Sequence, residues 1–205
     1  MNAKKESQES FDRQALTYDM DRNGSHAREQ YSIILQKMEN FRFANVLDVG
    51  CGTGEILKRI HKRYPEVSLT GVDISEKMLE VAKVKIGNKA TLLWADAEML
   101  PFSDATFDLI VCSDSFHHYP NPQKILAEFL RVLKRGGNLL ICDYSIGFPL
   151  RQLMNLFIRF SHDGDVHIYS KEEITKLVIQ ASFSNIQYER TTNATAFIIT
   201  GEKCK

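Results

Sequence analysis

VLDVGCGTG, residues 46–54, is the stretch that decides the fold of this chain. Its first half, Val46–Val49, predicts a short apolar strand. Gly50–Gly54 predicts a glycine-rich turn in which the backbone can approach a ligand closely. An amphipathic pattern over Glu55–Tyr64 predicts a helix after the turn, and Pro65 ends it. The free amides at the start of such a helix favour an anion.

Predicted strands and helices alternate along the chain after this turn. Further strands are predicted at residues 68–73, 90–95, 107–113 and 138–143. Ser75 is predicted to cap a helix that Gly87 ends, and Asn121 and Pro122 predict the start of a helix to about Leu133. This alternation predicts right-handed crossovers and a mainly parallel sheet. Strands as continuously apolar as FDLIVC predict helices on both faces.

The two ends of the chain add further elements. Helical spacing predicts a helix over residues 25–40. Ser170 and Glu173 form a capping box for a helix to about Ala181. Residues 183–190 and 194–200 then predict a β-hairpin at the sheet edge. We therefore expect one doubly wound α/β domain over residues 1–205, with residues 1–40 as an N-terminal cap.

Residues 144–169 interrupt the alternation of strands and helices, and we expect them to form a lid insertion. A helix is predicted over Pro149–Phe160, and its polar residues share an arc of roughly 100°. Three interpretations remain open. The helix packs on most sides, it covers an apolar acceptor, or it contacts a membrane surface or a second copy through a face that carries Arg151 and Arg159.

The composition of the chain disfavours several classes of protein. Lys and Arg number 26 and balance 26 Asp and Glu, so a general nucleic-acid binder is disfavoured. The sequence holds no apolar run long enough for a membrane span, and its polar N-terminus is unlike a secretory signal. Cys51, Cys112, Cys142 and Cys204 form no CxxC pair. We expect a reduced, cytoplasmic protein without a metal site.

Acidic residues stand where two further strands end. Asp73 ends the second strand, about 20 residues after the glycine turn, and its carboxylate can accept both hydroxyls of a ribose. Asp96 ends the third strand and can accept from an adenine amine, while Ala97 offers a backbone N–H to the adenine ring. The carboxyl ends of these strands should line one crevice, so the sequence predicts a nucleoside site.

The glycine spacing argues against a dinucleotide. That fingerprint requires G-x-G-x-x-G, but its third glycine is replaced by Glu55 or by Leu57, depending on the starting glycine. A nicotinamide oxidoreductase is therefore disfavoured, and a nucleoside without phosphates fits the loop better.

Four motifs together carry a family resemblance. VLDVGCGTG, GVDIS, WADAEMLPFSDATFDLIVCSDSFHHYPNP and the lead-in FDRQALTYD resemble class I S-adenosylmethionine-dependent methyltransferases, and most closely the small-molecule branch that includes the quinone-biosynthesis C-methyltransferases. The resemblance covers residues 11–143. It implies a seven-stranded sheet of order 3-2-1-4-5-7-6 and S-adenosylmethionine as cofactor, with S-adenosylhomocysteine as product.

The resemblance also assigns roles to individual residues. It places the methionine part of the cofactor beside the glycine loop, the ribose at the second strand, the adenine at the third strand, and the methionine amine near the loop and the fourth strand. Tyr18 would close over the methionine end. The implied cofactor residues are Tyr18, Asp48, Gly50, Cys51, Gly52, Asp73, Ile74, Asp96, Ala97 and Ser113. Asp48 and Tyr18 also have purely structural interpretations.

Methyl transfer mainly requires alignment of donor and acceptor and exclusion of water. A general base is needed only when the acceptor loses a proton. His117 and His118 are the candidates, and His117 is favoured because it lies nearer the strand end. A hydrogen-bonded loop without catalytic role remains the alternative for this pair.

We expect a small, partly apolar acceptor. The turn SDSFHHYPNP lacks the [N/D]-P-P-[Y/F] motif of DNA amine methylation, so no DNA substrate is expected. Because Lys and Arg residues are spread evenly along the chain, tRNA is disfavoured as a substrate. A non-catalytic S-adenosylmethionine-binding module that acts through a protein partner is the alternative function.

Overall fold

The computed structural model describes residues 3–20, 25–158, 164–191 and 195–204. Helices and strands alternate through most of this length. The elements in chain order are α1 Ala3–Gln14, α2 Ser25–Met38, β1 Asn45–Val49, α3 Glu55–Arg63, β2 Ser68–Asp73, α4 Glu76–Ile86, η1 Gly87–Lys89, β3 Thr91–Trp94, β4 Phe107–Ser113, η2 Phe116–His118, α5 Pro122–Val132, β5 Leu133–Tyr144, α6 Leu150–Phe157, α7 Lys171–Gln180, β6 Phe183–Arg190 and β7 Ala196–Lys203.

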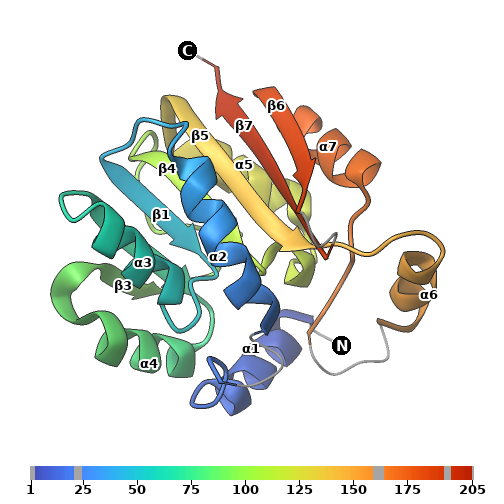
Figure 1. Ribbon diagram of the computed structural model, residues 1–205, viewed down its shortest axis with the longest axis horizontal. Helices are drawn as coiled ribbons and strands as arrows, with labels where there is room; N and C mark the ends of the chain where they lie inside the picture. Colours follow the sequence, from blue (N-terminus) through green and yellow to red (C-terminus); the bar gives the residue numbers. More distant parts are fainter. Residues whose placement is uncertain (1–2, 21–24, 159–163, 192–194, 205) are drawn as a thin grey trace.

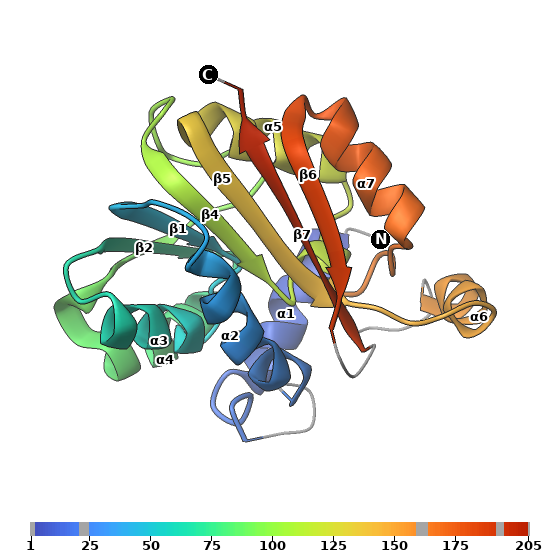
Figure 2. The ribbon, with the colours of Figure 1, turned by 45° about the horizontal axis from the view of Figure 1, so that its top comes forward.

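These strands form one seven-stranded sheet in the order β3-β2-β1-β4-β5-β7-β6 (Figures 1 and 2). Neighbouring strands from β3 to β5 run parallel, whereas β7 is antiparallel to both β5 and β6. The predicted mainly parallel sheet, its order and its C-terminal hairpin are confirmed.

The strands bury side chains on both faces. In β4, Leu109 and Val111 pack in the cluster beneath α2 and α3, while Ile110 and Cys112 pack on the opposite side with α5 and α7. Figure 1 shows α2 in front of the sheet and α5 behind it. Helices on both faces therefore explain why this strand is apolar at successive positions.

All three helices begin where they are predicted to begin, and two of them have a side-chain cap. Ser75 Oγ accepts from Met78 N at 3.1 Å, and Ser170 forms a complete capping box with Glu173. Asn121 occupies the cap position of α5, but its side chain donates instead to Glu98 Oε1 at 2.8 Å. The proline after Asn121 therefore starts this helix without side-chain capping.

Strand β5 begins at Leu133, five residues before the predicted start at residue 138. Gly136 and Gly137, which come before the predicted strand, lie inside β5. A Cβ at Gly137 would approach the carbonyl oxygen of Lys134 to 2.8 Å, so only glycine fits there. The pairing register with β4 shifts in the same region. The glycines permit an irregular strand rather than a turn.

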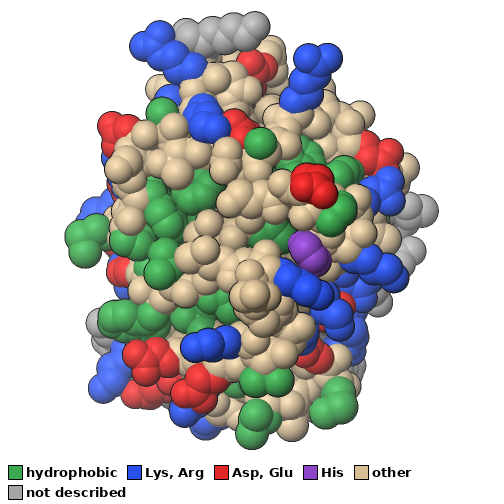
Figure 3. Space-filling view, turned by 90° about the vertical axis from the view of Figure 1, so that its left-hand side faces the viewer, with side chains coloured by type: hydrophobic (Ala, Val, Ile, Leu, Met, Phe, Trp, Pro, Cys, Tyr) green, Lys and Arg blue, Asp and Glu red, His purple; other side chains and the backbone are tan. Residues whose placement is uncertain are grey.

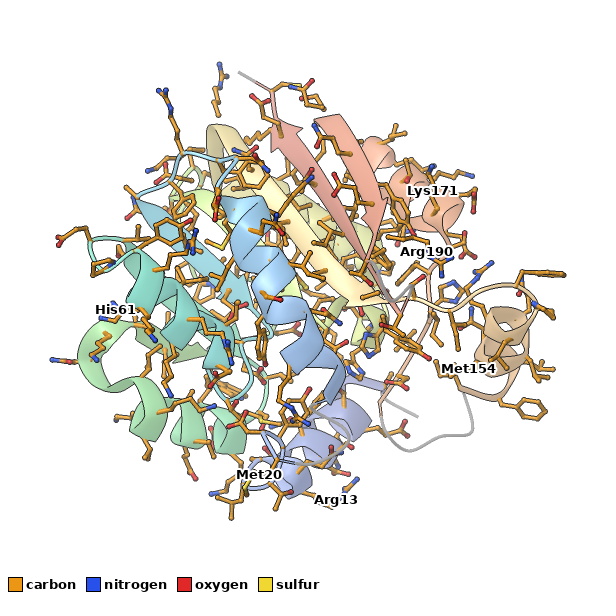
Figure 4. The ribbon with its side chains drawn as sticks, viewed as in Figure 1. Arg13, Met20, His61, Met154, Lys171 and Arg190 are labelled. Atoms are coloured by element: carbon orange, nitrogen blue, oxygen red, sulfur yellow. The ribbon has the colours of Figure 1, made fainter. Side chains whose placement is uncertain are left out.

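Helix α6 contradicts one of its three interpretations, that of a helix packed on most sides. Its residues are Leu150–Phe157, and the remainder of the predicted helix extends to residue 160, partly outside the described residues. None of its eight residues is buried, and Leu153 is 52% exposed and Phe157 58% exposed. Figures 1 and 2 place α6 at the edge of the molecule, and Figure 4 labels Met154 on it. A helix packed on most sides is therefore wrong.

Among the described residues, no helix combines the length and apolarity that a membrane span requires.

On the face over α3 and α4, basic and acidic side chains are intermixed (Figure 3). The crossover from β3 to β4 is not helical, and Arg131 holds it by donating to the carbonyl oxygens of Leu100 and Phe102.

Candidate functional site

A cavity lies at the carboxyl ends of β1 to β4, where the sheet order reverses direction on either side of β1. Its empty volume is about 970 Å³, its open mouth included. All ten cofactor residues predicted from the sequence line it. They are Tyr18, Asp48, Gly50, Cys51, Gly52, Asp73, Ile74, Asp96, Ala97 and Ser113. This position matches the general placement of ligands in open α/β sheets.

The glycine loop shapes the floor of the cavity. Gly50 and Gly52 adopt φ values of +74° and +51°, which L side chains rarely adopt. A Cβ at Gly50 would lie 2.0 Å from Ser115 Oγ, whereas a Cβ at Gly52 would meet no atom within 4 Å among the described residues. Gly50 thus allows close packing against the loop after β4, and Gly52 leaves open space beside the cavity.

Asp73 fixes the loop and stands at the end of β2. Its Oδ2 accepts from Gly52 N at 2.8 Å, and its Oδ1 accepts from Ser75 N at 2.8 Å. Burial raises the pKa of Asp73, and these backbone N–H groups oppose the shift. Each carboxylate oxygen retains acceptor capacity after one bond, so Asp73 can still receive ligand hydroxyls.

Asp48 is the least satisfied group of the site. The side chain is fully buried, and neither carboxylate oxygen has a hydrogen-bond partner among the described residues. Burial, with the nearby charge of Asp73, raises the pKa of Asp48 to about 8. An orphaned carboxyl group beside a cavity is costly unless a ligand compensates it. A cationic ligand group would do so, and S-adenosylmethionine carries both a sulfonium and an ammonium.

The N-terminal segment covers the cavity. Lys4, Ser7 and Phe11 of α1 line it together with Tyr18. Lys4 Nζ lies 2.7 Å from Asp96 Oδ2. Figure 2 shows α1 beyond the arrowheads of β4 and β5. The chain therefore brings its first helix to the ends of its central strands.

Two further ties hold this segment. Ser75 Oγ donates to Asp12 Oδ1 at 2.6 Å, which joins α1 to the cap of α4. Asp19 accepts from Thr53 Oγ1 at 2.6 Å and from Lys85 Nζ at 2.5 Å. The N-terminal segment is thus bound to the loops after β1, β2 and β3.

His117 does not line the cavity, unlike His118. Its ring Nδ1 lies 2.5 Å from Asp143 Oδ1, and its backbone N–H donates to the other oxygen of that carboxylate. Burial alone would lower the pKa of His117. The charge of Asp143 and hydrogen bonds to Asp143 and Asp165 instead raise it well above its usual value. A ring held as imidazolium is a poor base, so the preference for His117 is not supported by this geometry.

His118 lines the cavity and packs edge-on against Phe11, with ring centroids 4.9 Å apart. Burial and the charge of His117 lower the pKa of His118 to about 4. A neutral imidazole at the cavity wall can accept a proton. The structure therefore separates two adjacent histidines into a charged ring and a neutral ring.

Several lining residues were not foreseen from the sequence. Lys4 and Ser7 precede the motifs, Phe11 is the first residue of the lead-in FDRQALTYD but was given no role, and Tyr31 comes from α2. Asp114 has φ of +49° and accepts from Gln30 Nε2 at 3.2 Å. A polar residue directly after a predicted strand was the available signal for Asp114. The α1 residues carried no comparable signal.

Residues 47–141 match the family model described as a methyltransferase domain. A demethylmenaquinone methyltransferase of Thermotoga maritima is 37% identical over 98 residues, which cover 48% of this chain and 42% of that protein. The ubiquinone/menaquinone biosynthesis C-methyltransferase UbiE of Geotalea daltonii is 29% identical, with 96% of this chain and 95% of that protein covered. The chain thus spans less than half the length of the first of these relatives.

The structure is also similar to that of Haemonchus contortus phosphoethanolamine N-methyltransferase 2 in complex with S-adenosyl-L-methionine. The TM-score is 0.78 at 18% identity, over 95% of this chain and 57% of that one. The fold is thus shared with this methyltransferase, and residues 47–141 are similar to a methyltransferase domain. The proteins similar to it in sequence thus include a demethylmenaquinone methyltransferase and a ubiquinone/menaquinone biosynthesis C-methyltransferase.

Proposed function

We propose that this protein binds S-adenosylmethionine in the cavity and transfers its methyl group to a small, partly apolar acceptor. The observation that carries the proposal is the buried carboxyl group of Asp48, which has no hydrogen-bond partner among the described residues and lies beside a ligand-sized cavity. Such a group fits a cationic ligand, and the four acidic or glycine-rich strand ends fit a nucleoside.

Each part of the cofactor would bind at a different strand end. Asp73 and Ile74 would hold the ribose, and Asp96 and Ala97 would frame the adenine. The glycine loop at Gly50, Cys51 and Gly52 would approach the methionine part. Asp48 and the Ser113 carbonyl would face the methionine ammonium, and Tyr18 would close over that end.

The bound cofactor supplies an activated methyl group, so the protein mainly has to orient the acceptor and exclude water. Phe11 and Tyr18 on the N-terminal segment provide apolar cover for this purpose. When the acceptor must lose a proton, the neutral ring of His118 is the better placed group to accept it. His117, which Asp143 holds in place, would orient the adjacent ring of His118.

The names of the relatives point to a quinone-type ring as acceptor. The cavity offers it aromatic and aliphatic surface from Phe11, Tyr18, Tyr31 and Ile125.

Residues 1–40 would act as the cap of a single domain, and residues 144–169 would border the acceptor side. A small acceptor is favoured over DNA and tRNA. The four free cysteines are consistent with a reducing cytoplasmic setting.

Calorimetric titration of the purified protein with S-adenosylmethionine tests the cofactor, with Asp73→Asn as the variant. Loss of hydrogen bonds from ribose to a charged acceptor should cost about 2–4 kcal/mol, or about 30- to 1,000-fold in Kd. Asp104→Asn is the control, because Asp104 is 77% exposed and lies outside the cavity. No binding by the wild type would refute the proposal.

Turnover is tested with short-chain naphthoquinols and benzoquinols as acceptors, by measuring S-adenosylhomocysteine. Methylation of any of them supports a quinol acceptor. Tight cofactor binding without methylation of any small acceptor would favour a binding module that acts through a partner.

A further inference from the structure

Three potential metal ligands from two distant chain segments meet next to the cavity. The ring nitrogens His117 Nε2 and His118 Nδ1 and the carboxylate oxygen Asp165 Oδ1 all lie within 4.8 Å of one another. Asp165 Oδ1 is 3.5 Å from His117 Nε2 and 3.2 Å from His118 Nδ1. The sequence pointed to no metal site, because only the fold brings Asp165 to the histidine pair.

These spacings fit a common centre. Zinc–nitrogen and zinc–oxygen bonds of about 2.0–2.1 Å give a tetrahedron with edges of about 3.3–3.4 Å between ligand atoms. The two measured edges bracket this value. We propose that His117, His118 and Asp165 form a binding site for a divalent transition-metal ion, with Zn²⁺ as the best-fitting probe. Two imidazoles and one carboxylate are also a donor set that such ions accept.

The support behind His117 is that of a metal ligand. Its Nδ1 lies 2.5 Å from Asp143 Oδ1, and Asp143 is only 1% exposed. Metal-binding histidines commonly donate their second ring N–H to a carboxylate, which fixes the tautomer, and the ion would displace the proton from Nε2 of the His117 imidazolium. Asp143 is itself held by the backbone N–H groups of His117 and Tyr144. The Nε2 atom is thereby directed toward Asp165.

His118 provides an independent indication. Its side chain is only 10% exposed, and Nδ1 is buried without a hydrogen-bond partner among the described residues. Asp165 Oδ1 is near enough, at 3.2 Å, but the geometry of a hydrogen bond is not met. Ligand atoms of a metal site likewise point at a shared centre rather than at one another. A cation at that centre would satisfy this nitrogen.

Three protein ligands leave one tetrahedral position open. His118 lines the cavity whereas His117 and Asp165 do not, so the ion would lie behind the cavity wall. Metal binding and proton acceptance at His118 Nδ1 would use the same lone pair and exclude each other. The metal site itself does not rest on the proposed methyl transfer, so the two can fail separately.

The test is calorimetric titration of the chelator-treated, full-length protein with Zn²⁺, in the absence of S-adenosylmethionine. We expect one ion per chain and at least a 100-fold weaker affinity in Asp165→Asn. Asp143→Asn should weaken binding by about 10- to 100-fold. His167→Gln is the matched control, because His167 is two residues from Asp165 and its ring faces Glu173 instead.

No stoichiometric binding by the wild type, undiminished binding by Asp165→Asn, or loss of binding in His167→Gln would each overturn the site. If Asp165→Asn does not fold, as judged by circular dichroism, X-ray absorption of zinc-loaded wild-type protein replaces it. Two imidazoles per zinc support the proposal. Fewer than two overturn it.

Discussion

Lys4 Nζ lies 2.7 Å from Asp96 Oδ2 and 2.9 Å from Glu98 Oε1, so the first helix is tied to the end of the third strand. Asp96 is the carboxylate expected to face the adenine. The same group therefore serves the cover of the cavity and, in our proposal, the ligand beneath it. Release of the cofactor should require this tie to open.

The variant Lys4→Met tests this coupling. Loss of a partly buried pair of charge-assisted contacts should weaken closure by about 1 kcal/mol, which corresponds to roughly fivefold faster cofactor dissociation. Stopped-flow displacement measures this rate. Lys5→Met is the control, since Lys5 is 71% exposed and, among the described residues, pairs only with Glu9 of the same helix. Equal dissociation rates for wild type and Lys4→Met would show that the tie does not gate the cavity.

Asp48→Asn should separate stability from binding. Asp48 keeps its proton up to about pH 8 in the fold, whereas an unfolded aspartate ionises near pH 4. The raised pKa of Asp48 therefore lowers the free energy of unfolding progressively as pH rises between these values, by about 4 kcal/mol at pH 7. Urea denaturation should therefore show a more stable variant at pH 7 and no gain near pH 4, while titration shows weaker S-adenosylmethionine binding. A destabilised variant at pH 7 would contradict this account.

Cofactor binding should itself depend on pH. A cation binds the ionised form of Asp48, so a raised pKa near 8 in the free protein makes binding release a proton. Affinity should rise from pH 6 to pH 8 and level off above this range. Calorimetry in buffers of different ionisation enthalpy counts the proton, and Asp48→Asn should abolish its release. A release that persists in this variant would place the titrating group elsewhere.

The two histidines should behave differently in catalysis. For an acceptor that must lose a proton, His118→Gln should lower kcat by about 10²- to 10⁴-fold. Since the pKa of His118 is about 4, the wild-type rate should fall only below about pH 5. Assays with a chelator present keep the ring free of metal, and His167→Gln provides the control. Unchanged kcat in His118→Gln would show that the acceptor loses no proton to this ring.

Helix α6 should tolerate charge on its exposed apolar residues. Leu153→Glu together with Phe157→Glu should change the free energy of unfolding by about 0.5 kcal/mol or less, because both side chains are more than half exposed. Leu126→Ala in α5 is the contrasting variant and should cost about 2–5 kcal/mol, since Leu126 is fully buried. Urea denaturation measures both. A raised KM for an apolar acceptor in the α6 variant would support a lid, and a large loss of stability would restore the packed interpretation.

Strand ends were predictable from the sequence because their geometry is local. Parallel strands end at one edge of the sheet, so residues that follow Val49, Val72 and Ala95 had to meet there. Helix caps such as Ser75 were equally predictable, because a cap bonds to an amide only three residues away. Asn121 also lies at its predicted cap position, but its side chain donates to Glu98 of another loop and makes no cap hydrogen bond, which local sequence does not encode.

Side-chain direction and long-range contacts were not readable in this way. Adjacent residues His117 and His118 differ because a buried carboxylate on β5 holds only the first ring. The amphipathic pattern of α6 describes one face but does not say what covers it.

The sequence by itself determined the parallel sheet, the glycine loop and the acidic strand ends, because these follow from periodicity and from short-range backbone chemistry. Tertiary structure alone decided that Lys4 reaches Asp96, that His118 rather than His117 faces the cavity, and that Asp165 joins the histidine pair. Such contacts join residues far apart in the chain. Their partners are selected by packing of the whole fold, which no local pattern encodes.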